Sequence, residues 1–228
     1  MLMPSRGYPL PAYEAPAAIL PEAAPAGAEP PPFEPFAKIP RFARESTTTE
    51  KINGTNAQIL VTQYGDVFAG SRTRWISPGK LTDNYGFAAW VEGNRDELLD
   101  LGPGKHFGEW WGAGIQSGYG LTERRFSLFN VARWRPRPEV RTPSPAEEAF
   151  IHEKACFAPA CCDVVPVMYR GPFDTAAVDA CLQRLRVEGS VAAPGFMQPE
   201  GVIIHHSSSG TLWKRLLVND EGHKGTLH

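Results

Sequence analysis

Short runs of strand-forming residues, each closed by a turn, constrain the fold of this chain most strongly. Residues 57–63 read AQILVTQ, the triplet YGD at 64–66 breaks the run, and VFAG at 67–70 resumes it. Strand-forming runs interrupted by a short glycine-containing turn indicate an antiparallel hairpin. A second hairpin is predicted near the C-terminus, where residues 199–206 and 211–217 flank the turn SSSG.

The segments between the hairpins predict further helices and strands. Apolar residues at mixed helical spacing predict a core-facing helix over 83–101, ended by the triplet GPG. A short helix is expected from Pro145 with Ser144 as its N-cap, and another over 174–186. Strands are expected over 124–134 and 164–169. The fold class is therefore α+β.

Composition limits the classes of protein to which the chain can belong. The 228 residues are 42% hydrophobic, which is enough for a sizeable core, and the net charge of −2 argues against a uniformly basic nucleic-acid coat. No apolar run approaches the roughly 18 residues that span a bilayer, and no signal region begins the chain. We expect a cytoplasmic protein without a membrane partner.

Local composition divides the chain into a tail and one domain. Residues 1–35 are rich in proline and alanine, so they predict a disordered tail, and residues 36–228 predict one folded domain.

Four cysteines lie within 156–181, and their spacing fits neither paired zinc knuckles nor a disulfide framework. Reduced thiols without a structural metal are expected there.

Residues 50–56 read EKINGTN, a lysine in a short glycine-containing loop that leads into the first hairpin. At neutral pH an exposed lysine is almost entirely ammonium and is a poor nucleophile. Desolvation or neighbouring cations favour the neutral amine, and Gly54 allows the backbone to approach a ligand closely. Because lysines before turns are common, Lys51 is a candidate nucleophile only in the company of other functional residues.

Further positions carry candidate functional groups. Arg72 follows the first hairpin and has the forked donors that suit phosphate. Glu109 lies in the aromatic run HFGEWWG at 106–112, where a carboxylate is costly to bury unless it binds a ligand. Glu200 begins the C-terminal hairpin, whose return strand carries a basic pair at 214–215. A solvated or structural side chain is the alternative interpretation of each.

In this order the motifs resemble those of the covalent nucleotidyltransferase superfamily, which includes ATP-dependent DNA and RNA ligases and mRNA capping enzymes. The closest resemblance is to the phage-type RNA ligase 2 family. Residues 50–56 are similar to its lysine motif, 107–112 to its glutamate motif, 200–204 to its second acidic motif and 212–215 to its last basic motif. The resemblance extends from about residue 36 to the end, and it implies two antiparallel sheets flanked by helices around an ATP cleft.

The resemblance also implies a role for each matched residue. Lys51 would attack the α-phosphate of ATP to form a lysyl-adenylate, and Lys214 would stabilise the charge that develops on that phosphate. Glu109 would hold the ribose hydroxyls, Phe129 would stack on adenine, and Glu200 would help to place Mg²⁺ or Mn²⁺. Arg72 would contact the nucleotide or the RNA 5′-phosphate. The implied nucleotide-binding residues are Glu50, Asn53, Arg72, Glu109, Phe129, Glu200 and Lys214.

The resulting functional expectation is an ATP-dependent RNA ligase that joins RNA 5′-phosphate and 3′-hydroxyl ends. We expect a monomer that works either as a bare catalytic domain or with an accessory protein that supplies end binding, because no accessory domain follows the last motif. The alternatives are a DNA nick ligase, a GTP-dependent capping enzyme and a nucleotide- or RNA-end-binding module with impaired catalysis. Asn53, where the superfamily usually has aspartate, and the single lysine at 214, where a lysine pair is usual, favour the last alternative.

Overall fold

The computed structural model describes residues 32–218, and its contacts divide the chain into the units Met1–Ile39 and Pro40–His228. The predicted disordered tail lies mostly outside the described residues. All helices and strands below belong to the second unit. In the described part of the chain, no helix is long and apolar enough to span a bilayer.

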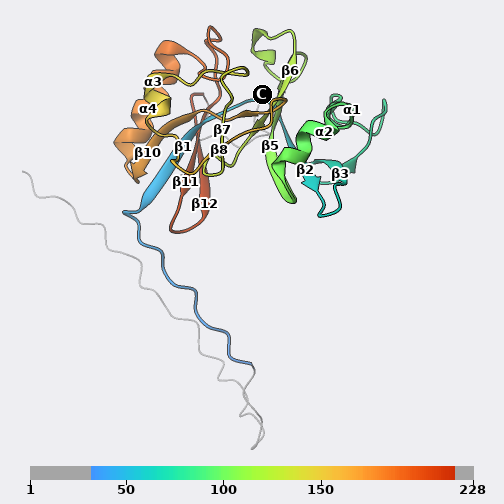
Figure 1. Ribbon diagram of the computed structural model, residues 1–228. Coiled ribbons are helices and arrows are strands. Elements are labelled where there is room, and N and C mark those ends of the chain that lie inside the picture. Colours follow the sequence, from blue (N-terminus) through green and yellow to red (C-terminus); the bar gives the residue numbers. More distant parts are fainter. Residues whose placement is uncertain (1–31, 219–228) are drawn as a thin grey trace, which may run out of the picture. The chain divides into compact units, whose positions relative to one another are not determined.

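The strands form three sheets (Figure 1). Sheet A has the order β10-β1-β11-β12, sheet B has the order β4-β3-β2-β5-β6-β9, and β7 pairs with β8. The strands are β1 (Glu45–Lys51), β2 (Thr55–Val61), β3 (Val67–Ser71), β4 (Trp75–Ile76), β5 (Gly104–Gly112), β6 (Arg124–Leu128), β7 (Trp134–Arg135), β8 (Cys156–Phe157), β9 (Asp163–Val164), β10 (Val167–Pro172), β11 (Gly201–His206) and β12 (Thr211–Leu216). The helices are α1 (Phe87–Gly93), α2 (Arg95–Leu98), η1 (Leu99–Leu101), η2 (Gly118–Gly120), α3 (Pro145–Glu148) and α4 (Thr175–Glu188).

Both predicted hairpins are confirmed. Strands β2 and β3 pair antiparallel around the turn at 64–66, and β11 pairs with β12 around the turn at 207–210. The α4 helix is also confirmed, with the Asp174 side chain as its N-cap and Val178, Leu182 and Leu185 buried. Ser144 caps α3 as expected, because its hydroxyl accepts a hydrogen bond from the Glu147 amide at 3.2 Å.

Other predicted elements are interrupted at identifiable residues. The helix expected over 83–101 breaks at Asn94, between α1 and α2. The strand expected over 164–169 is divided between β9 and β10 at Pro166, which has no amide hydrogen to donate to a ladder. The strand expected over 124–134 ends at Leu128, because the Asn130 side chain and carbonyl accept hydrogen bonds from the following turn.

The expectation of two antiparallel sheets is corrected. Sheet A is antiparallel throughout, but sheet B is mixed because β9 runs parallel to β6, and the small β7–β8 pair is also parallel. The chain leaves β6 and returns to the edge of sheet B only at Asp163. A connection of that length allows the returning strand to run in the same direction, which a tight hairpin cannot do. The α+β class stands.

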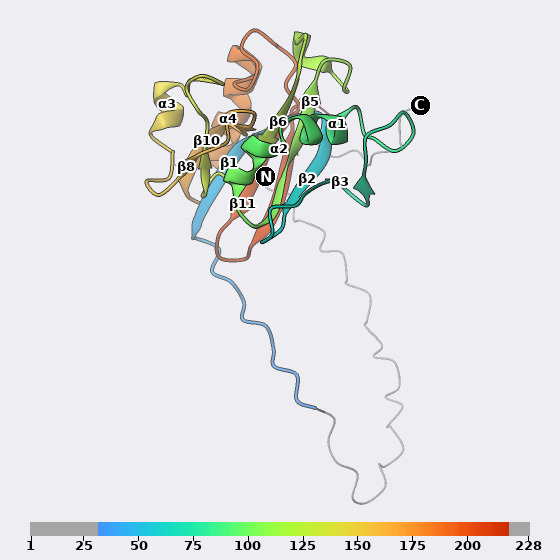
Figure 2. The same ribbon diagram turned by 45° about the vertical axis from the view of Figure 1, so that its right-hand side comes forward.

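Successive side chains of a strand point to opposite faces of its sheet, and one face of each sheet is covered by helices (Figures 1 and 2). In sheet B, Ile59, Trp110 and Phe126 pack with Phe87 of α1 in one buried cluster. In sheet A, the corresponding cluster joins Val202 and Ile204 to α4. The opposite face carries Lys51 and Lys214 in sheet A and Glu109 in sheet B.

A buried ion cluster holds the segment between β7 and β8 in place. The Arg141 guanidinium forms two hydrogen bonds with the Glu147 carboxylate, at 2.7 and 3.0 Å, and lies 3.3 Å from Asp163 Oδ2. All three side chains are at most 8% exposed. Burial raises the pKa of Asp163, and the Arg141 charge opposes this shift. The cluster ties the 135–150 segment to the β9 edge of sheet B.

We predict that Arg141→Ala lowers the free energy of unfolding by about 3 to 5 kcal/mol, because it leaves two buried carboxylates without a cation. Urea denaturation at pH 7 measures the loss. Arg184→Ala is the matched control: Arg184 pairs with Glu188 on the exposed surface of α4, and its loss should cost less than about 0.5 kcal/mol. Equal effects in the two variants would contradict a structural role for the buried cluster.

Candidate functional site

Lys51 is the last residue of β1, and its side chain contacts Glu200, the residue immediately before β11. Its Nζ lies 2.5 Å from Glu200 Oε2, and the two side chains are 20% and 18% exposed. The register explains the pairing, because Lys51 stands opposite Gly201, the neighbour of Glu200. The sequence predicted a loop around Lys51 and missed β1 itself, although the run STTT at 46–49 is rich in β-branched residues.

The loop after Lys51 is attached to sheet B through its backbone. The Asn53 amide donates to the Tyr119 hydroxyl at 2.8 Å, and the Gly54 amide donates to Glu109 Oε1 at 3.0 Å. A Cβ atom at Gly54 would lie 2.5 Å from the Trp110 carbonyl oxygen. Such an approach excludes any side chain, so the glycine is required by contact with β5 rather than by contact with a ligand.

Glu109 is buried where the two sheets meet. Besides the Gly54 amide, its carboxylate accepts a hydrogen bond from the Asn56 side chain at 3.0 Å. Burial raises the pKa of Glu109 to about 7, the Lys51 charge and the Gly54 hydrogen bond oppose this rise, and Glu200 adds to it. The structure therefore brings Lys51, Glu109 and Glu200 within electrostatic reach of one another.

The Glu50 side chain does not join this group, and its hydrogen bonds give it a structural role. The side chain is 1% exposed, since adjacent strand residues point to opposite faces and Lys51 takes the open one. Its two oxygens accept hydrogen bonds from the Ser190 hydroxyl and from the amides of Val191 and Ala192, at 2.6 to 2.9 Å. Burial raises the pKa of Glu50, and these hydrogen bonds oppose the rise.

Strand register places Lys214 on the same face of sheet A as Lys51. Lys214 stands opposite Ile203 in β11, Ile203 stands opposite Thr49 in β1, and Thr49 shares the face of Lys51 two residues away. Arg215 belongs to the other face, where its guanidinium lies 3.5 Å from Asp179 of α4. The basic pair of the last motif is therefore divided between the two faces of sheet A.

The remaining candidates lie on sheet B. Phe129 follows β6, its amide donates to the Phe107 carbonyl at 2.9 Å, and its ring is 41% exposed. Phe129 lies on the same face of sheet B as Glu109, because Glu109 pairs with Ser127 and Ser127 is two residues before Phe129. Arg72 lies in the exposed turn between β3 and β4, and it makes no hydrogen bond or ion pair with any residue between 32 and 218.

Sequence reasoning missed the residues that hold the site in place. Tyr119 has φ of 52°, and its ring packs against Trp111 and Phe196 with centroids 4.8 and 4.5 Å apart. Burial raises the pKa of its hydroxyl, so the hydroxyl stays protonated beside Asn53. Asn56 was visible in the lysine motif but was not linked to Glu109, and nothing in the sequence indicated Ser190.

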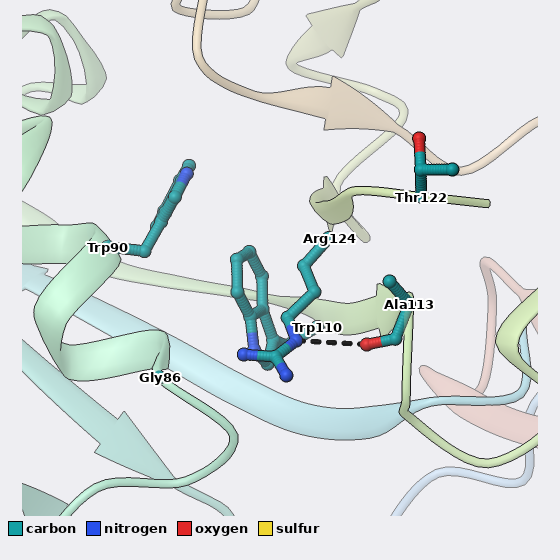
Figure 3. Close-up of a pocket in the computed structure, with 6 residues that line it drawn as sticks. All are labelled: Gly86, Trp90, Trp110, Ala113, Thr122 and Arg124. Carbon is teal, nitrogen blue, oxygen red and sulfur yellow. Dashed lines mark hydrogen bonds between the residues drawn. The ribbon is translucent and has the colours of Figure 1, made fainter.

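The hollow in Figure 3 lies on the other face of sheet B. Its volume is about 400 Å³, and it is lined by Gly86, Trp90, Trp110, Ala113, Thr122 and Arg124. Arg124 Nε donates to the Ala113 carbonyl at 3.0 Å, and the Trp110 ring points away from the Glu109 face. This hollow is thus separate from the group around Lys51.

Residues 44–215 match the family described as RNA ligase, a match that includes every residue of the Lys51 group. The chain belongs to the RNA ligase family. No curated protein matches the chain.

The chain is also distantly similar to solved structures of an RNA ligase. A Naegleria gruberi RNA ligase mutant without ligand is 15% identical, with a TM-score of 0.49, over 76% of this chain and 50% of that chain. A mutant of the Naegleria gruberi RNA ligase with ATP and Mn is 13% identical, with a TM-score of 0.48, over the same shares. The Naegleria gruberi RNA ligase with PPi is 12% identical, with a TM-score of 0.47, again over 76% and 50%. The chain spans about half the length of these structures.

The raised pKa of Glu109 predicts a pH dependence of stability. The folded state binds this proton more tightly than the unfolded state does, so the stabilisation by protonation is complete below pH 4.5 and is lost as the pH rises through about 7. Relative to Glu109→Gln, the free energy of unfolding of the wild-type protein should fall by up to about 3 kcal/mol across that window. Denaturant unfolding of both proteins between pH 4.5 and 8 measures the difference. Glu123→Gln, at an exposed side chain, is the control, and a constant wild-type minus Glu109→Gln difference would contradict the prediction.

Glu50→Gln separates the structural role from a nucleotide contact. The amide group of glutamine turns one acceptor into a donor that faces backbone amides, so we expect the free energy of unfolding to fall by about 2 to 3 kcal/mol. Glu45→Gln, at the exposed start of β1, should change it by less than about 0.5 kcal/mol. Loss of ATP affinity in Glu50→Gln at unchanged stability would restore the assignment that the sequence suggested.

Proposed function

We propose that this protein is an ATP-dependent RNA ligase that joins a 5′-phosphate to a 3′-hydroxyl through a lysyl-adenylate on Lys51. The observation that carries the proposal is the contact of Lys51 with Glu200, beside the buried Glu109, inside a segment that matches the RNA ligase family. A lysine that is part-buried and paired with a carboxylate has a proton acceptor at its nitrogen. It differs in this respect from a solvated lysine before a turn.

The first step would form a bond between Lys51 Nζ and the α-phosphorus of ATP and break the bond to pyrophosphate, which leaves with the electron pair. The ammonium group has three protons and the phosphoramide nitrogen has one, so two protons leave in total. The Glu200 carboxylate, 2.5 Å from Nζ, is placed to take one of them as the nucleophile forms. The second proton would pass to solvent or to the departing phosphates.

Two further transfers would complete the reaction. An oxygen of the RNA 5′-phosphate would attack the phosphorus of the lysyl-adenylate, the P–N bond would break, and Lys51 would regain its protons. The 3′-hydroxyl would then attack the activated 5′-phosphate, lose its proton, and displace AMP to form the phosphodiester. No oxidant or further co-reactant is needed.

Other residues would position the nucleotide. Glu109, with a pKa of about 7, can both accept and donate a hydrogen bond at neutral pH, which suits ribose hydroxyls. The half-exposed Phe129 ring is available for stacking on adenine. Lys214 projects from the face of sheet A that carries Lys51, where a cation would oppose charge on the α-phosphate. Arg72, without a carboxylate partner among residues 32–218, is available to a phosphate.

The carboxylate of Glu200 fits a magnesium ion whose other ligands include the phosphates of the substrate. Mg²⁺ commonly uses one or two carboxylates together with substrate phosphates, and no cluster of three ligating side chains occurs within residues 32–218. Glu200 would supply the protein ligand. When bound, the ion would offset the negative charge of the phosphates as pyrophosphate leaves.

The decisive experiment uses ATP labelled at the α-phosphate. With Mg²⁺, we expect label that stays on the protein after denaturation, is absent from Lys51→Ala and is reduced at least 10-fold in Glu200→Ala. Lys154→Ala, at an exposed loop lysine, is the control and should label normally. GTP should give no label, which separates a ligase from a capping enzyme. An unlabelled wild-type protein would overturn the proposal.

A nucleotide-binding module that does not seal strands is the second candidate. The observation in its favour is that Leu216, and not a second basic residue, follows Lys214 on the open face of β12. Formation of a joined product from RNA with 5′-phosphate and 3′-hydroxyl ends decides between the candidates, because a module without sealing activity forms none. Parallel assays with nicked RNA, nicked DNA and RNA–DNA hybrids test the DNA-ligase alternative.

A further inference from the structure

Three aromatic side chains that the proposed chemistry does not use lie exposed on the open face of sheet B. Phe68 of β3 is 49% exposed, Trp75 of β4 is 52% exposed and Phe107 of β5 is 52% exposed. We call these three residues the aromatic face. Large apolar side chains that lie together on one side of a sheet, instead of being scattered singly, are typical of a surface that binds a ligand or a macromolecule.

Strand register shows that the three rings share one face. Phe68 stands opposite Leu60, Phe107 stands opposite Gln58, and Leu60 and Gln58 are two residues apart in β2, so their side chains point the same way. Trp75 stands opposite Gly70, which is two residues from Phe68. The Phe68 and Trp75 ring centroids are 6.3 Å apart at an angle of 57°, so neither ring covers the face of the other.

The aromatic face continues toward the proposed nucleotide site. Glu109 follows Phe107 by two residues in β5 and therefore points to the same side of sheet B. The β1 and α4 elements lie apart from this part of β2 and β3 in Figure 1, and the helices α1 and α2 cover only the opposite face, through the buried cluster around Phe87. Each of the three aromatic residues therefore keeps about half of its surface exposed.

The charges around the aromatic face are basic and unpaired. Arg72 and Arg74 lie in the turn that leads to Trp75, and Lys105 precedes Phe107 by two residues on the same face. None of these three cations forms an ion pair with another residue in the described range. Apart from the buried Glu109, strands β2 to β5 bring no carboxylate to this side. Exposed rings among unpaired cations are the combination that binds single-stranded nucleic acid, through base stacking and phosphate contacts.

We infer that the aromatic face binds unpaired nucleotides of the RNA substrate, with bases stacked on Phe68, Trp75 and Phe107 and phosphates held by Arg72, Arg74 and Lys105. A fully paired duplex keeps its bases stacked on one another and offers no free base surface to these rings. The substrate class is therefore an RNA end with unpaired nucleotides near the joint, in preference to a nick in a continuous duplex. This inference rests on the proposed function for the identity of the polymer.

Fluorescence anisotropy of the full chain without ATP tests the binding step. The probes are a 5′-phosphorylated 12-nucleotide single-stranded RNA and a nicked RNA duplex of the same sequence, each with a fluorescein label. Phe68→Leu, Trp75→Leu and Phe107→Leu keep an apolar side chain and remove the ring. We expect each to weaken single-strand binding at least 5-fold, since stacking contributes about 1 to 3 kcal/mol per base. The wild type should bind the single strand at least 10-fold more tightly than the nicked duplex.

Phe157→Leu is the matched control, because Phe157 is 42% exposed but lies on β8, outside sheet B, under the Arg135 guanidinium. It should bind both probes as the wild type does. The three aromatic-face variants should also form the lysyl-adenylate at the wild-type rate, since none of the three residues is assigned to the nucleotide. Normal labelling of Lys51 with unchanged RNA binding in all three variants would overturn the inference and leave the proposed function standing.

Failure of the proposed ligase chemistry gives a different result from failure of this inference. If no lysyl-adenylate forms but the aromatic-face variants still lose single-strand binding, the surface assignment holds and the ligase chemistry does not. If the variants instead change the sedimenting mass of the protein without changing RNA affinity, the aromatic face is a contact between copies of this chain, and the inference is overturned.

Discussion

Contact between the Lys51 ammonium and the Glu200 carboxylate joins the end of β1 to the start of β11, and the organisation of the site depends on it. The pair lies beside Glu109, whose carboxylate also holds the Gly54 amide. The site thus contains one cation and two acidic groups at close range, and burial raises the pKa of one of these, Glu109, to about 7. A proton shared across this group costs less than two full negative charges beside each other would.

The same contacts hold the Lys51 side chain in a defined direction. A part-buried ion pair fixes the direction of the lysine side chain, while hydrogen bonds to Tyr119 and Glu109 fix the backbone of the following loop. Lys51 is therefore oriented both by Glu200 and by the contacts of the loop that follows it. In the proposed reaction, cations such as Lys214 and Arg72 would oppose the negative charge that an incoming phosphate brings to this group.

The two sheets use their faces in the same way. Each buries one face under helices, with Phe87 of α1 on sheet B and Leu182 of α4 on sheet A, and each keeps functional side chains on the other. This division explains why Arg215 turns to Asp179 while Lys214 does not, and why Glu50 is buried next to an accessible Lys51. It also leaves the rings of Phe68, Trp75 and Phe107 uncovered, beyond the reach of the α1 cluster.

The sequence by itself determined the hairpins, the α4 helix and the order of motifs that predicted an RNA ligase, because turn residues, periodicity and motif spacing are local properties. It also identified Lys51, Glu109 and Glu200, which the structure brings together. Only the tertiary structure decided that Glu50 points into the core, that Asn56 and Tyr119 hold the site, and that β9 runs parallel to β6. Those outcomes depend on strand register and on contacts between residues far apart in the sequence, such as Asn56 with Glu109 and Asn53 with Tyr119, to which local composition is insensitive.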